Sequence, residues 1–202
     1  MPDLFDPPPR HAIEAAARHK IFFAVRPEPE AAGRMFRFAE AQRRRLGLTG
    51  RPTPPERLHI SLNGLGRHVA PPERLIAAAT GAVSGLAWLS FIVALDRLGT
   101  WGRGAGKRPL VLWSDEGLIG VSRLHEAIQT RLVGARVVRG PERAFCPHLT
   151  LLRDAAVAPE RRVGPFMWRV RELVLLDSLH GEGRHEVLDR WPLGERPRCV
   201  AT

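Results

Sequence analysis

The chain has 202 residues, 44% of them apolar, and a formal net charge of +10 at pH 7. This length suits one large domain or two interlocked lobes, and no apolar run is long enough to span a bilayer. Its two cysteines do not make a disulfide framework and no charged-then-apolar leader opens the chain, so a cytoplasmic protein without a membrane partner is expected.

The positive charge favours a polyanionic partner, because cationic surfaces bind phosphates with release of counterions. Lys20 and Lys107 are the only lysines among the 31 basic residues, and the rest are arginines. Such a skew, with abundant Ala, Gly and Pro, is also typical of a GC-rich genome. The charge therefore supports a nucleic-acid partner only modestly.

The elements expected from apolar periodicity begin after an N-terminal extension over 1–19, in which 1–10 are Pro-rich and 11–19 could form a short helix. A single domain is expected over 20–202. Its predicted strands are 20–26, 58–63 (ended by Gly64 and Gly66), 88–98, 109–113, 146–153, 167–178 and 184–191. Its predicted helices are 28–46, 71–83 and 115–133, the last with Ser114 or Asp115 as N-cap.

Two basic segments have a structural and a functional interpretation. Arg43-Arg44-Arg45 near the end of the first helix complements the helix dipole, which is the more common role, or it clamps RNA. The glycine-rich loop over 101–108 departs from the GxxxxGK[ST] phosphate loop, since neither Ser nor Thr follows Lys107. It is either a flexible cationic connection beside the site or an ordinary surface hairpin.

One short pattern occurs twice, as HISL over 59–62 and as HLTL over 148–151. Successive side chains of a strand point to opposite faces, so His59 shares a face with Ser61, and His148 shares a face with Thr150. The intervening Ile60 and Leu149 belong to the opposite, core-facing side. Two such strands could place two imidazoles around one substrate, as a general acid and a general base require.

These motifs resemble the paired HxTx motifs of the 2H phosphoesterase superfamily. In particular, the chain is similar to the RNA 2′,3′-cyclic phosphodiesterases, also called 2′-5′ RNA ligases. The similarity runs from about residue 20 to 193 and includes the segments 21–25, 108–113, 146–153 and 176–193. Asn63-Gly64-Leu65-Gly66 departs from the bulky apolar pair that is usual before the glycine in this family.

The resemblance implies a duplicated, two-lobed α+β fold. The repeat halves would be about 20–100 and 108–193, with two antiparallel sheets around a central groove and helices outside. This resemblance also implies that the protein is a monomer and that its partner is RNA that ends in a 2′,3′-cyclic phosphate.

The resemblance also implies the chemistry. His59 would be the general acid on the 3′-oxygen and His148 the general base on water, although the two motifs by themselves are too symmetric to assign these roles. Ser61 and Thr150 would hold the phosphate, and neither a metal nor a cofactor would be needed. Arg153 matches the family's arginine, but strand alternation points it with Leu149 and Leu151, away from His148, unless a bulge intervenes.

Several alternatives stay open. A metal site would need a third ligand, for which His68 or His185 is available, and Cys146 could act as a nucleophile beside His148. The same fold could cleave 2′-5′ oligonucleotides or another small cyclic phosphate, or run the reaction backwards as a 2′-5′ ligase. A non-catalytic RNA-binding module is the alternative from a different class.

Overall fold

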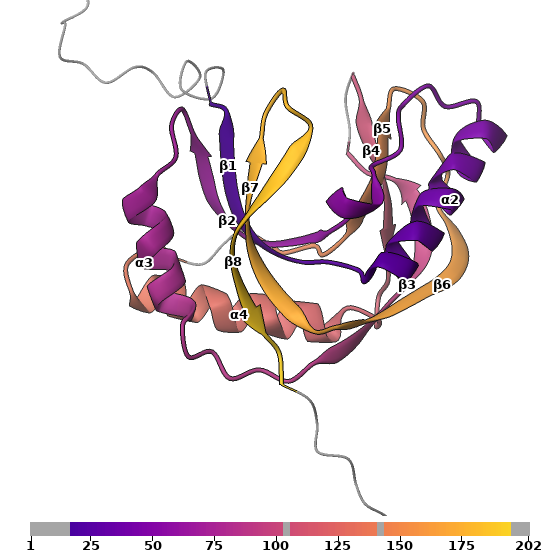
Figure 1. Ribbon diagram of the computed structural model, residues 1–202. Helices are drawn as coiled ribbons and strands as arrows, with labels where there is room; N and C mark the ends of the chain where they lie inside the picture. Colours follow the sequence, from indigo (N-terminus) through magenta and orange to yellow (C-terminus); the bar gives the residue numbers. More distant parts are fainter. Residues whose placement is uncertain (1–16, 103–105, 141–143, 195–202) are drawn as a thin grey trace, which may run out of the picture.

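The computed structural model describes residues 17–102, 106–140 and 144–194 (Figure 1). The predicted helix over 11–19 lies largely outside these residues, as does the centre of the loop over 101–108. The strands are β1 (His19–Val25), β2 (Ile60–His68), β3 (Phe91–Thr100), β4 (Arg108–Trp113), β5 (Leu149–Asp154), β6 (Arg161–Val170), β7 (Glu172–Leu179) and β8 (Arg184–Pro192).

Within the described residues these eight strands form one sheet, in the order β6-β3-β4-β5-β2-β1-β7-β8. Neighbouring strands pair antiparallel. The sheet is strongly curled, so that β1, β2, β7 and β8 make one arm and β3, β4, β5 and β6 make the other (Figure 1). The α+β class is confirmed, but the two sheets expected are the two arms of one continuous sheet.

The arms do not coincide with the sequence halves 20–100 and 108–193. Strand β3, from the first half, pairs with β4 and β6 in the second arm. Strands β7 and β8, from the second half, extend the first arm beside β1. Each arm therefore contains strands from both of these sequence halves.

The helices are α2 (Pro29–Arg45), the 3₁₀ turn η1 (Pro55–Arg57), α3 (Glu73–Val83) and α4 (Ile119–Gly134). Helix α4 begins four residues later than the expected start at Asp115. Ser114 Oγ accepts a hydrogen bond from the Gly117 N–H at 3.1 Å, and the Gly117 carbonyl accepts one from the Ala94 N–H of β3 at 3.1 Å. This turn is therefore bonded to the sheet, and the helix starts after it. No helix of the described residues is long and apolar enough to cross a membrane.

Strand β1 is buried on both of its faces, which defines the two sides of the sheet. Ile21, Phe23 and Val25 point to the outer face, where they join the main hydrophobic core. Phe22 and Ala24 point to the opposite, inner face. There they form a smaller cluster with two side chains of β7, Val174 and Leu176.

Several strand boundaries differ from those predicted, and two of the differences change the course of the chain. Strand β2 does not end at the glycines but runs through Gly64 and Gly66 to His68, which pairs with His19. Gly66 has a φ of 98° at an irregular part of the β1–β2 register, a conformation that glycine adopts without strain. The segment predicted as one strand over 167–178 is divided at Arg171 between β6 and β7.

Candidate active site

The two histidine motifs meet where the arms of the sheet join. Ile60 of β2 is paired with Leu149 of β5, the single register pair recorded between these strands in the described residues. Both side chains are fully buried on the outer face, in the main core. The residues on either side of this pair, His59 and Ser61 on one strand and His148 and Thr150 on the other, therefore share the inner face.

Both histidines lie one residue before their strands rather than inside them, since β2 begins at Ile60 and β5 at Leu149. Each ring is held by the backbone just upstream. His59 Nδ1 donates to the Arg57 carbonyl at 2.7 Å, and His148 Nδ1 donates to the Cys146 carbonyl at 2.9 Å. A carbonyl can only accept, so Nδ1 carries a proton in both rings and Nε2 is the atom left for chemistry.

The surroundings of His59 are apolar and crowded. Its ring centroid lies 5.1 Å from that of Phe22 and 5.0 Å from that of His185, which meets it edge-on. Burial lowers the pKa of His59 to about 4, and the nearby charges of Lys20, Arg57 and His148 lower it further, against the opposing effect of the Arg57 carbonyl. His59 is therefore neutral in the free protein near pH 7.

His148 has more open surroundings. Its ring packs against Trp101 with a centroid distance of 4.9 Å, and Trp101 in turn packs against Trp113 at 5.2 Å. The imidazole of His148 is thus held by a backbone hydrogen bond and by an aromatic contact. Trp101, the first residue of the glycine-rich loop over 101–108, thus contacts the histidine.

A bulge in β5 places Arg153 on the face opposite to the one that strand alternation alone predicts for it. Thr150 pairs with Val111 and Leu152 pairs with Leu110, so Leu151 is an extra residue in β5. Leu151 and Leu152 are consequently both buried, whereas Arg153 is exposed. Arg153 thus lies on the same inner face as Thr150. The hydroxyl-bearing Ser61 and Thr150 are half-buried.

Sequence reasoning gave Phe22 and Lys20 no part in the site, and it offered His185 only as a candidate metal ligand. His185 belongs to β8 and contacts both His59 and Phe22. Burial, followed by the charges of His59, Arg57, Lys20 and Arg26, lowers its pKa to about 3. Lys20 lies over the Phe22 ring at 5.2 Å. The signal for Lys20 was its place in the alternation of β1, which puts it on the face of Phe22.

The open alternatives for other residues find little geometric support. Among the described residues, no three His, Cys, Asp or Glu side chains are grouped so that they could hold a metal ion. His68 Nε2 is bonded to the Leu65 carbonyl at 2.9 Å. Cys146 is exposed, and its carbonyl, rather than its thiol, is the group bonded to His148.

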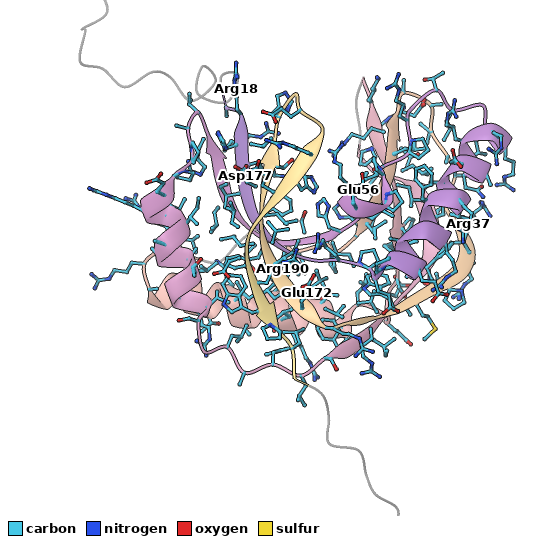
Figure 2. All side chains as sticks on the ribbon, viewed as in Figure 1. Arg18, Arg37, Glu56, Glu172, Asp177 and Arg190 are labelled. Carbon is cyan, nitrogen blue, oxygen red and sulfur yellow. The ribbon has the colours of Figure 1, made fainter. Side chains whose placement is uncertain are left out.

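A cavity of about 830 Å³ is lined by residues from the start of α2, the η1 turn and the strands β6, β7 and β8. Glu56, Glu172 and Arg190 are among its lining residues, and their places on the fold are shown in Figure 2. Arg26 and Arg190 both bond to Glu172, at 3.0 Å. None of the residues predicted for catalysis or substrate binding lines this cavity.

Comparison of the fold places the molecule among the phosphoesterases. A crystal structure described as a phosphoesterase has a TM-score of 0.68 and 25% identity, over 88% of this chain and 99% of that one. The apo form of LigT from Escherichia coli has a TM-score of 0.66 and 27% identity, over 88% of this chain and 99% of that one.

Sequence comparison identifies the family. The model of the 2′-5′ RNA ligase superfamily matches residues 27–182. The RNA 2′,3′-cyclic phosphodiesterase of E. coli strain K12 is 30% identical over 148 residues, which are 71% of this chain and 80% of that protein. The chain belongs to the 2′-5′ RNA ligase superfamily.

Proposed function

We propose that this protein is a phosphoesterase that hydrolyses the 2′,3′-cyclic phosphate end of RNA and leaves a 2′-phosphate. The observation that carries the proposal is the junction at Ile60 and Leu149, which brings two histidines and two hydroxyls to one face of the sheet. The family relative from E. coli is an RNA 2′,3′-cyclic phosphodiesterase, which agrees with this substrate.

In the proposed reaction, water attacks phosphorus while the bond from phosphorus to the 3′-oxygen breaks. His148 takes the proton of water on Nε2, and His59 gives a proton from Nε2 to the departing 3′-oxygen. Because His59 is neutral in the free protein, it must bind its proton together with the anionic substrate, whose charge favours the imidazolium. The products are a 2′-phosphate and a 3′-hydroxyl.

The non-bridging oxygens need donors as their charge develops. The hydroxyls of Ser61 and Thr150 share the inner face with the imidazoles, and the bulge in β5 brings Arg153 to that face as well. These donors, with the imidazolium, can balance the charge of a phosphoryl transition state. No metal ion is needed for this chemistry, and the enzyme would act as a monomer in the cytoplasm.

Ligation follows when the 5′-hydroxyl of another RNA takes the place of water. His148 would take the proton of that hydroxyl and His59 would protonate the departing 3′-oxygen, so that the cyclic end is joined through a 2′-5′ linkage. Hydrolysis dominates in water because water is in great excess over 5′-hydroxyl ends.

The test is incubation of the purified protein in EDTA with a short RNA that ends in a 2′,3′-cyclic phosphate, followed by mapping of the product ends. Wild type should form a 2′-phosphate, and His59→Ala and His148→Ala should each lower the rate by about 10²–10⁴-fold. His180→Ala, an exposed histidine elsewhere, is the matched control and should keep full activity. RNA that is bound but unchanged, or a 3′-phosphate product, would contradict the proposal.

A further inference from the structure

Two cations stand side by side on the inner face of the first arm. Lys20 of β1 and Arg67 of β2 are register partners across the antiparallel pair. Side chains directly opposite each other in such a pair point to the same face of the sheet. For Lys20 this is the inner face, because Phe22, two residues further on, lies there.

This pair of cations adjoins the histidine site. The Lys20 ammonium lies 5.2 Å from the centroid of the Phe22 ring, and the Phe22 ring lies 5.1 Å from that of His59. One aromatic ring thus separates the ammonium from the imidazole.

A third cation faces the pair from the other arm. Arg153 of β5 is turned to the inner face by the bulge at Leu151. Partial burial lowers the pKa of Lys20, and the charges of Arg67 and Arg153 lower it further, so both guanidinium groups are near the ammonium. The three cations come from β1, β2 and β5, and both arms contribute.

None of these three cations forms an ion pair with a carboxylate in the described part of the chain. Elsewhere the protein pairs its arginines, as with Arg97, which bonds to both Asp115 and Glu160. Like charges held together without a counter-charge repel one another, and an anion bound among them removes that repulsion. The arrangement is therefore suited to a ligand phosphate.

We propose that Lys20 and Arg67 bind the phosphodiester on the 5′ side of the terminal nucleotide, next to the cyclic phosphate held by the histidines. This inference rests on the proposed function. A strand that ends in a 2′,3′-cyclic phosphate continues only in the 5′ direction, so its next anion is that phosphodiester. The protein thus prefers oligonucleotides to mononucleotides, and Arg67 is a residue that sets this preference.

The test compares binding of two probes by calorimetry in EDTA. ApAp carries one phosphodiester and a terminal 3′-phosphate, whereas 3′-AMP carries only the terminal phosphate. Wild type should bind ApAp about fivefold more tightly than 3′-AMP, and Arg67→Gln should lose about that factor for ApAp while changing 3′-AMP by less than about twofold. When the salt concentration is raised from about 50 mM to about 200 mM, wild type should lose affinity for ApAp more steeply than for 3′-AMP. In Arg67→Gln the loss of affinity for ApAp should be less steep than in wild type.

Arg37→Gln is the matched control. Arg37 is an exposed arginine of α2, away from β1 and β2 (Figure 2), so this variant removes the same charge and should bind both probes as wild type does. The proposal is overturned if wild type binds the two probes equally. It is also overturned if Arg67→Gln weakens both probes alike or if Arg37→Gln weakens ApAp as much.

Turnover separates this proposal from the proposed function. The two substrates are the dinucleotide ApA with a 2′,3′-cyclic phosphate end and adenosine 2′,3′-cyclic phosphate. Arg67→Gln should lower kcat/KM about fivefold for the dinucleotide and leave kcat/KM for the mononucleotide unchanged. If wild type hydrolyses neither substrate but still discriminates ApAp from 3′-AMP through Arg67, the proposed reaction is wrong and the phosphodiester site stands.

Discussion

His59 and His148 are held in the same tautomer by the same local device. Each donates Nδ1–H to the carbonyl two residues upstream, at 2.7 and 2.9 Å, and each precedes the strand whose first residue joins the two arms. Their surroundings differ, however, because Phe22 and His185 enclose His59 while His148 packs against Trp101 on a more open side. The two imidazoles therefore occupy equivalent backbone positions but have different environments.

The first prediction concerns the pH dependence of kcat/KM. Catalysis needs one protonated and one neutral imidazole, so the doubly protonated pair is inactive. That pair can form only when His59 is protonated in the free protein, with a pKa of about 4. Activity on cyclic-ended RNA should therefore fall on the acidic side near pH 4, well below the ordinary histidine value of about 6.5. Initial rates, with circular dichroism at each pH to confirm folding, measure this. A fall near pH 6 would contradict the pKa that burial gives His59.

The second prediction separates the acid from the base. A p-nitrophenyl phosphodiester has a leaving group that departs without a proton, so loss of the general acid matters little for it. His59→Ala should lose about 10²–10⁴-fold on cyclic-ended RNA but much less on the p-nitrophenyl ester, while His148→Ala should lose similar factors on both. Steady-state rates of both variants on both substrates decide. The opposite pattern would exchange the two roles.

The third prediction concerns His185. Its ring covers one side of His59, and burial is the largest cause of the low pKa of His59. His185→Ala should let water reach His59 and raise that pKa towards its ordinary value, whereas His185→Phe, which keeps the cover, should leave it low. Titration of the His59 ring proton by NMR measures the shift. Equal pKa values in the two variants would show that His185 does not shield His59.

The fourth prediction concerns Asp154, which follows Arg153. Its Oδ2 accepts from the Thr49 and Gly50 N–H groups at 2.7 and 2.6 Å, and its Oδ1 accepts from the Ala156 N–H at 2.9 Å. These hydrogen bonds, led by the one from Ala156, lower the pKa of Asp154 to about 2. The carboxylate thus fixes the loop before β2's motif to the end of β5.

Asp154→Ala should lower the thermal midpoint by several degrees at pH 7. The pKa of Asp154 in the folded protein lies below the ordinary aspartate value of 3.8, so the stabilisation is present above that value and is lost as pH falls towards about 2. The difference in midpoint between wild type and Asp154→Ala should therefore shrink over that interval in thermal scans. Glu116 is an exposed carboxylate without these backbone hydrogen bonds, so Glu116→Gln is the control. Its thermal midpoint should equal that of wild type both at pH 7 and near the lower end of the interval.

Local sequence was sufficient for several parts of the fold and the site. Strand alternation assigned His59 with Ser61 and His148 with Thr150, and it placed Ile60 and Leu149 in the core, because the period of two is a property of a single strand. The order of the strands and helices from β1 to β5 followed from apolar periodicity, whereas β6 and β7 were predicted as one strand. The roles of these residues and the internal duplication of the chain stay predictions.

Tertiary structure decided what depends on a partner strand. The bulge that turns Arg153 to the inner face arises in the pairing of β5 with β4, and the path of β2 through Gly64 and Gly66 arises in its pairing with β1. The enclosure of His59 by His185 and the gathering of Lys20, Arg67 and Arg153 likewise join residues far apart in the chain. The alternation of side chains within one strand does not indicate which strands pair with it, so these features are determined only by the tertiary structure.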